Sequence, residues 1–164
     1  MEDGRGQFKA GTIEGVKIRP LKRHLDERGW LAEIFRIDEL DPKIRPVMAY
    51  VSETLPGVTR GPHEHLEQTD YFCFLGTSSF EVTFWDNRRD SPTYWNRQTL
   101  VTEEGDPCIV IVPEGVVHAY RNIGRKPGWV IDCANRLYAG AGRKGPIDEI
   151  RHEEDPHSPF RLVT

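Results

Sequence analysis

Short apolar runs, each bounded by glycine or proline, limit the folds that this chain can adopt. The 164 residues include 15 Gly and 12 Pro, and the runs between them are rich in β-branched and aromatic residues. The runs with the length and composition of strands are VMAYVSE, DYFCFLG, SFEVTFWD, QTLVTE, PCIVIVP, HAYRNIG and GWVIDCA. In the third run Phe80, Val82 and Phe84 alternate onto one face. No window has a sustained helical period, so the sequence predicts an all-β sandwich or barrel.

The length indicates a single domain. A chain of 164 residues is long enough for one core of ordinary size and too short for two. We expect one domain over residues 1–164, with a core of about 13–156 and a polar, turn-rich C-terminal tail lying over the barrel. The best helical candidate is a short turn near the segment IDELDPKIRP, which its prolines limit.

Charge and apolar content argue against several classes of protein. The 22 basic and 26 acidic residues give a net charge of −4, whereas a nucleic-acid binder would present a net basic surface. No apolar run reaches the roughly 18 residues that a membrane helix needs, and the first residues lack the apolar region of a signal peptide. Cys73, Cys108 and Cys133 are too scattered for a disulfide framework or a zinc ribbon. We therefore expect a cytoplasmic protein that binds neither nucleic acid nor membrane.

Two histidines one residue apart mark the segment GPHEHLEQTDYF, residues 61–72. On a strand, residues two apart point to the same face, so His63 and His65 project together, followed by Glu67 if the strand continues. A third histidine, His118, follows the turn PEGVV after the strand CIVIV. Imidazole and carboxylate groups in such a cluster suit either a metal centre or the removal of a proton from carbon.

The spacing of these residues resembles the two motifs of the cupin superfamily. The first motif comprises Gly57, His63, His65, Asp70 and Gly76. The second, which matches in full, comprises Gly105, Pro113, Gly115, His118 and Asn122. The first has Asp70 where the pattern has Glu, and one residue fewer before its last glycine. The resemblance implies a double-stranded β-helix, a jelly-roll barrel with short flanking helices or turns, in which the three histidines meet at one mouth. The alternative is that one or two histidines only form hydrogen bonds inside the barrel.

A second resemblance covers residues 13 to 156, with matches scattered in order along the chain. The segments IEGVKIRPL (13–21) and DERGWLAEIF (26–35) are similar to the opening strand and the D-x-R-G-x-x-x-E-x-F signature of the dTDP-4-dehydrorhamnose 3,5-epimerases. The further matches are RGPH (60–63), SPT (91–93), PEGVVH (113–118), DEIR (148–151) and DP (155–156). In that family the histidine of the Arg-Gly-Leu-His segment is the catalytic base, and His63 stands at its position.

This resemblance implies a nucleotide-sugar epimerase or isomerase. It would remove a proton next to the 4-keto group of a dTDP-4-keto-6-deoxyhexose-type substrate, with His63 as the base. Arg60, His65 and His118 would supply donors for the enolate oxygen, so that His65 joins the catalytic group and His118 contacts the substrate. No metal or organic cofactor would be required.

The same family resemblance implies how the substrate is held. Arg28, Glu33 and Arg60 would bind the nucleotide-diphosphate sugar, because a guanidinium group matches phosphate oxygens in a bidentate manner. For Arg28 and Glu33 the alternative is an ordinary surface ion pair. The family also implies a homodimer, with strands and nucleotide contacts exchanged across the interface.

The chain departs from that family at the active site. The position of the family's lysine falls on Thr69, that of its catalytic tyrosine falls near Asp132, and the tail does not reach the carboxylate that would pair with the base. Asp132 lies in an apolar strand, where burial would raise its pKa and let it serve as the acid. The alternative is an ion pair with Arg121 or Arg136. Further candidate donors, which would otherwise be packing residues, are Tyr71 and Tyr138.

Three other interpretations stay open. The R-G-x-H-x-H pattern also resembles the sugar 3,4-ketoisomerases, small cupins that move a proton between neighbouring carbons. His63, His65, His118 and a carboxylate, Asp70 or Glu67, would form a coordination shell for a divalent transition metal in a metal-dependent cupin enzyme. A non-catalytic sugar-binding cupin would explain the missing lysine and tyrosine. The sequence does not choose the sugar, the nucleotide or the carbon that is inverted.

Overall fold

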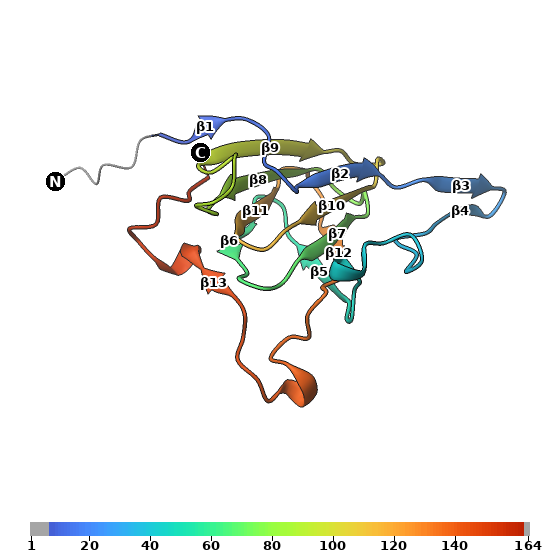
Figure 1. Ribbon diagram of the computed structural model, residues 1–164. Coiled ribbons are helices and arrows are strands. Elements are labelled where there is room, and N and C mark those ends of the chain that lie inside the picture. Colours follow the sequence, from blue (N-terminus) through green and yellow to red (C-terminus); the bar gives the residue numbers. More distant parts are fainter. Residues whose placement is uncertain (1–6, 163–164) are drawn as a thin grey trace.

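The computed structural model describes residues 7–162 as a barrel of two facing β-sheets with a small hairpin beside it (Figure 1). The six-stranded sheet has the order β1–β9–β8–β11–β6–β13, with the bounds Lys9–Ala10, Asn96–Thr102, Phe80–Asp86, Val116–Asn122, Thr59–Glu64 and Ile150–Arg151. The five-stranded sheet has the order β2–β10–β7–β12–β5, with the bounds Lys17–Pro20, Cys108–Val112, Asp70–Phe74, Gly128–Asp132 and Tyr50–Thr54. The predicted all-β jelly-roll barrel is confirmed.

Side chains from both sheets fill the space between them. Phe74 of β7, Phe80 of β8 and Tyr120 of β11 pack edge to face, with ring centroids 5.3–5.7 Å apart. Such pairs add about 0.5–1.5 kcal/mol each to the stability that burial alone provides. The predicted alternation of β8 is confirmed, because Phe80, Val82 and Phe84 all belong to this core.

A hairpin extends away from the barrel (Figure 1). It consists of β3 (Arg23–Asp26) and β4 (Gly29–Ala32), and its Leu25 and Leu31 are 76% and 66% exposed. The chain then returns across the outer face of the five-stranded sheet. There its apolar side chains pack against a second cluster, Leu21, Tyr71, Cys73, Ile109, Ile111 and Cys133. The helical turn expected near IDELDPKIRP is the 3-10 turn η1 (Pro42–Ile44).

The C-terminal tail is ordered over the barrel, and β13 pairs with the edge of β6. It contains the 3-10 turns η2 (Ala141–Arg143) and η3 (His152–Glu154). His152 Nε2 lies 2.9 Å from Glu64 Oε1, and Phe160 packs against Trp85. Packing therefore extends beyond residues 13–156, whereas the ends of the expected 1–164 domain, residues 1–6 and 163–164, lie outside the described residues.

Neither long helices nor disulfides contribute to the described part of the chain. Between residues 7 and 162 the helical segments are three-residue 3-10 turns, and none is long enough to span a membrane. Cys73, Cys108 and Cys133 are free thiols, and two of them are buried.

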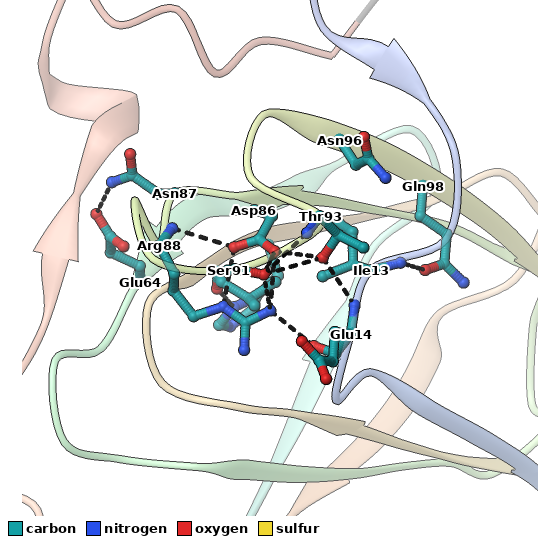
Figure 2. Close-up of polar contacts among 12 residues, drawn as sticks. Ile13, Glu14, Glu64, Asp86, Asn87, Arg88, Ser91, Thr93, Asn96 and Gln98 are labelled. Atoms are coloured by element: carbon teal, nitrogen blue, oxygen red, sulfur yellow. Dashed lines mark hydrogen bonds and ion pairs between the residues drawn. The ribbon is translucent and has the colours of Figure 1, made fainter.

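A fully buried carboxylate, Asp86 at the end of β8, organises the turn that leads to β9. Figure 2 shows Arg88, Ser91 and Thr93 converging on this carboxylate. Both hydroxyls donate to Asp86 Oδ2 at 2.6 Å, and Arg88 Nε donates to Oδ1 at 2.8 Å. Arg88 Nη2 also donates to the Glu14 carbonyl at 2.7 Å, which ties the N-terminal segment to this turn. Burial alone would raise the pKa of Asp86, but these hydrogen bonds outweigh it and lower the pKa to about 2.

Replacing this carboxylate should destabilise the barrel. Asp86→Asn leaves Arg88 partly buried without its counter-charge, and we expect the free energy of unfolding to fall by about 2–4 kcal/mol at pH 7. Because the folded pKa of Asp86 lies below its unfolded value of about 3.9, the wild type should lose this advantage as the pH falls from about 4 to 2. Urea denaturation of both proteins at each pH measures the difference, and an unchanged gap at pH 2.5 would contradict the assignment.

Candidate active site

A register shift between β6 and β11 brings two predicted site residues to one side of the sheet. His63 pairs with His118, but Arg60, three residues back along β6, pairs with Tyr120, only two residues further along β11. The extra residue makes a β-bulge, in which Gly61 has a φ of +85°. A Cβ at Gly61 would lie 2.6 Å from the backbone oxygen of His118, so the bulge depends on glycine. Strict alternation would place His63 and Arg60 on opposite faces, and the bulge lets them share one.

A cavity of about 430 Å³ lies beside these two residues. Its walls come from both sheets and from the tail: Tyr50, Ser52, Thr59, Arg60, Gly61, His63, Phe72, Tyr120, Glu149, Arg151 and Glu153. We call it the histidine cavity. A neighbouring tail cavity of about 400 Å³ is lined by residues that include His65, Gln68, Arg136, Tyr138, Arg143 and Asp148. The two cavities share Tyr50, Glu149 and Arg151, so they adjoin one another.

His63 has the properties of a free base. Its ring packs edge-on against His118, with centroids 4.5 Å apart, and it forms no hydrogen bond with any residue between 7 and 162. Burial, followed by the charge of His118, lowers the pKa of His63 to about 2. The imidazole is therefore neutral at physiological pH and offers a lone pair to the histidine cavity.

A buried carboxylate lies behind His63. Asp70 is 1% exposed, and its Oδ2 lies 3.2 Å from His65 Nε2 and 3.1 Å from His118 Nε2. Gln68 Nε2 donates to the other oxygen at 2.6 Å. Burial would raise the pKa of Asp70, but the contacts with His118 and His65 outweigh it and hold this pKa far below its ordinary range. Burial would likewise lower the pKa of His65, but Asp70 raises it to about 9. His65 and Asp70 thus form a buried ion pair.

His65, which we predicted to be catalytic, has both ring nitrogens engaged within the protein. Nε2 faces Asp70, and Nδ1 forms a short hydrogen bond with the backbone carbonyl of Asp148. The Asp148 carboxylate accepts the backbone N–H groups of Leu66, Glu67 and Gln68 at 2.8–3.0 Å. His65 therefore links the tail to the β6–β7 loop by a hydrogen bond. It lines the tail cavity and not the histidine cavity.

The three predicted histidines come together at the mouth of the barrel. One ring nitrogen from each of His63, His65 and His118 lies within 4.8 Å of the others, a spacing that a metal ion could bridge. His118 is 2% exposed and lines neither cavity. Its Nδ1 lies 3.0 Å from the Val116 carbonyl, and its Nε2 forms no aligned hydrogen bond with a described residue despite its closeness to Asp70. Glu67 lies in the exposed loop after β6, away from this cluster.

Asp132, the predicted acid, is buried at the end of β12. Its Oδ1 accepts the backbone N–H of Tyr71 at 3.1 Å, and no described residue forms an aligned hydrogen bond with Oδ2. Burial, followed by the charge of Asp70, raises the pKa of Asp132 well above its ordinary value. Among the described residues no ion pair joins Asp132 to Arg121 or Arg136, and Arg136 Nε donates to the Glu67 carbonyl at 3.4 Å. Tyr138 lines the tail cavity only.

The predicted substrate ligands separate into two groups. Arg60 lines the histidine cavity, where Thr54 Oγ1 and the Glu53 carbonyl accept hydrogen bonds from its Nε and Nη2. Arg28 lies at the tip of the hairpin and pairs with Asp26 at 2.6 Å. Glu33 lies beyond the hairpin, 3.8 Å from Arg36. Within one chain, neither Arg28 nor Glu33 reaches the histidine cavity.

Sequence reasoning missed Tyr50, Tyr120 and Arg151, all of which line the histidine cavity. The alternation of the run VMAYVSE could have placed Tyr50 and Ser52 on one face, because both point inward from β5. Arg151 pairs in register with His63, but nothing in the sequence indicates that the tail joins the edge of β6.

Comparisons with known proteins agree with this architecture. The family model described as dTDP-4-dehydrorhamnose 3,5-epimerase matches residues 10–145. The probable low-salt glycan biosynthesis epimerase Agl13 of Haloferax volcanii is 38% identical over 129 residues, which cover 77% of this chain and 81% of that protein. The spore coat polysaccharide biosynthesis protein SpsL of Bacillus subtilis is 35% identical over 126 residues, which cover 77% of this chain and 82% of that protein.

Solved structures share the fold. A dTDP sugar isomerase from Desulfovibrio desulfuricans G20 aligns with a TM-score of 0.74 at 22% identity, over 91% of each chain. NovW, a 4-keto-6-deoxy sugar epimerase from the novobiocin gene cluster of Streptomyces spheroides, aligns with a TM-score of 0.73 at 23% identity, over 96% of this chain and 79% of NovW. The family model spans most of the barrel and both relatives exceed 30% identity; this chain belongs to the dTDP-4-dehydrorhamnose 3,5-epimerase family.

Proposed function

We propose that this protein is a nucleotide-sugar epimerase that acts on a dTDP-4-keto-6-deoxyhexose-type substrate without a metal or organic cofactor. The observation that carries the proposal is His63, a neutral imidazole that faces the histidine cavity and has no hydrogen-bond partner among residues 7–162. The names of the relatives support a sugar substrate: Agl13 is called an epimerase of glycan biosynthesis, and SpsL a polysaccharide biosynthesis protein.

The reaction begins at a carbon next to the ketone. His63 takes the proton from this carbon, and the electron pair of the broken C–H bond moves toward the ketone oxygen to give an enolate. Arg60 and Arg151 line the same cavity, and their guanidinium groups stabilise the negative oxygen and the diphosphate. A proton returned to the opposite face of the carbon inverts it, and His63 then releases its proton to water.

The second proton comes from a group other than the family's lysine or tyrosine. The position of the lysine falls on Thr69, whose hydroxyl donates to Glu114 Oε2 at 3.0 Å inside the protein. The position of the tyrosine falls near Asp132, which is buried and lines neither cavity. The first half of the reaction is thus retained, and the return of the proton uses different residues.

The functional unit is a homodimer in which the hairpin of one protomer serves the cavity of the other. Leu25 and Trp30 expose apolar surface on one face of the hairpin and Leu31 on the other, and Arg28 at its tip is 85% exposed. Such a surface suits burial against a second copy. Arg28 and Glu33 line neither the histidine cavity nor the tail cavity of their own chain, so they would contact a nucleotide diphosphate bound to the partner.

A metal-dependent cupin enzyme is the second candidate, because the histidine cluster has the spacing of metal ligands. His63, His65 and His118 would hold a divalent transition metal, with Asp70 as a fourth ligand, and the metal would polarise the ketone. The contacts of Asp70 favour the metal-free candidate, since its Oδ2 faces Nε2 of both His65 and His118 directly.

Removing the base should abolish turnover. We expect His63→Asn to lower kcat/KM by at least about 100-fold, because a general base contributes about 10²–10⁴-fold. In D2O, the C3 proton signal of dTDP-4-keto-6-deoxyglucose should disappear in NMR spectra with the wild type and persist with the variant. The exposed control His157→Asn should behave as the wild type.

Full turnover by His63→Asn would contradict the proposal. A wild-type protein that binds the nucleotide sugar without proton exchange would indicate a binding protein, and transfer of the keto group to C3 would indicate a ketoisomerase. The C5 signal reports whether a second centre is inverted.

Metal removal should leave activity unchanged. Chelator-treated protein with less than about 0.1 equivalent of metal by mass spectrometry should exchange the C3 proton at the untreated rate, since the proposed step uses imidazole and guanidinium groups alone. Activity that vanishes on chelation and returns with one equivalent of iron, manganese or nickel would establish the metal-dependent candidate instead.

Charging the hairpin should separate the protomers. Leu25→Asp combined with Leu31→Asp should convert the dimer to a monomer in light scattering after gel filtration, because buried unpaired carboxylates oppose association. Epimerisation should fall with it, as Arg28 and Glu33 leave the partner's cavity. Val101→Asp, at a residue 51% exposed on β9, is the matched control. A wild-type monomer with full activity would contradict this arrangement.

A further inference from the structure

A tyrosine stands across the histidine cavity from the base. His63 comes from β6 in the six-stranded sheet, whereas Tyr50 comes from β5 in the five-stranded sheet that faces it. Both side chains line the histidine cavity, and Tyr50 is 48% exposed. A sugar ring held between the two sheets therefore presents opposite faces to the imidazole and to the phenol.

A buried acid lies beside this phenol. Asp132 pairs in register with Tyr50 between β12 and β5, so their side chains lie next to each other on one face of the sheet. Asp132 is 1% exposed, and its Oδ2 has no aligned hydrogen bond with any described residue. Tyr50 is nevertheless close enough to affect the pKa of Asp132. Since Asp132 lines neither cavity, its proton can reach the substrate only through a neighbour, and Tyr50 is placed to pass it on.

The other tyrosine and glutamate side chains near the site are less well placed to give a proton to the face of the substrate opposite His63. The Tyr120 hydroxyl lies 3.2 Å from Ser52 Oγ, and its ring is enclosed by the aromatic core. Tyr71 points to the outer face of its sheet and donates to a backbone carbonyl. Glu149 and Glu153 line the cavity but belong to the tail, which pairs with the same strand as the base. Tyr50 is the phenol that opposes His63.

We propose that Tyr50 is the catalytic acid that returns a proton to the substrate on the face opposite His63, with the Asp132 carboxyl behind it as a proton reserve. The inference rests on the proposed epimerase function. It assigns the second half of that reaction to a strand that sequence comparison with the family did not point to, and it gives Asp132, predicted as the direct acid, an indirect role.

The proton balance is simple. The Tyr50 O–H bond breaks as the enolate carbon forms its new C–H bond, and the ketone is restored. The resulting phenolate takes a proton from the Asp132 carboxyl, whose carboxylate is reprotonated by water through Tyr50 before the next turnover. The proton that His63 removed leaves to solvent. Burial raises the pKa of Tyr50, which keeps the phenol protonated between turnovers.

The test separates proton removal from inversion. Wild type, Tyr50→Phe and the distant control Tyr94→Phe are incubated with dTDP-4-keto-6-deoxyglucose in D2O, and NMR follows both the C3 proton and the inverted product. We expect Tyr50→Phe to exchange the C3 proton within about threefold of the wild-type rate, because His63 can return deuterium to the same face. Inversion should fall by at least about 100-fold. Asp132→Asn should slow inversion and leave exchange intact, and Tyr94→Phe should change neither.

The outcomes are distinguishable. Inversion by Tyr50→Phe at the wild-type rate would overturn the assignment, as would loss of inversion in Tyr120→Phe or Tyr138→Phe with exchange intact. An equal fall in exchange and inversion for Tyr50→Phe would also overturn it, since that is the result expected of a packing or binding role. A wild type that never exchanges the C3 proton would overturn the proposed function itself, and Tyr50 with it.

Discussion

The antiparallel pairing of β6 with β11 is the interaction on which the rest of the site depends. It sets His63 against His118, and its one-residue bulge turns Arg60 to the same side. The other edge of β6 receives β13, which places Arg151 directly beside His63. A slip of one residue in this register would place each of these side chains on the opposite face of the sheet, and the histidine cavity would not form. Gly61 protects the register, because only glycine fits so close to the neighbouring strand.

Burial is the main reason that His63, the proposed base, is neutral, and a buried anion sets the charge of its neighbour His65. Asp70 lies out of contact with water and needs a counter-charge, and His65 supplies it as an imidazolium ion. A proton on the neighbouring His63 is disfavoured mainly by burial and next by repulsion from His118, with a smaller contribution from His65. The three histidines therefore differ although they share one cluster: His65 is a cation, His118 packs against His63, and His63 is the proposed proton acceptor.

Periodicity was enough to predict an all-β sandwich or barrel, and the resemblance to the cupin motifs added the meeting of its histidines. Alternation in β8 and the shared face of His63 and His65 depend on neighbours along a single strand, which a sequence displays directly, whereas His118 was added by the cupin resemblance. The remaining parts of the site depend on long-range pairing. The bulge at Gly61, the joining of the tail to β6 and the facing of Tyr50 toward His63 follow from contacts between strands far apart in the chain. Arg28 and Glu33 were predicted to bind substrate, but neither lines the histidine cavity of its own chain.

The position of β13 links the cover of an exposed strand edge to the assembly of the proposed active site. Before the tail docks, β6 is the outermost strand of its sheet and presents unpaired backbone groups, the kind of edge on which proteins aggregate. When it docks, its two residues pair with Glu64 and His63 of this edge and bring Arg151 beside His63, the proposed base. In a nascent chain, the strands of the barrel leave the ribosome before β13 does. A protomer therefore gains partial cover of this edge in the same step that completes its proposed active site.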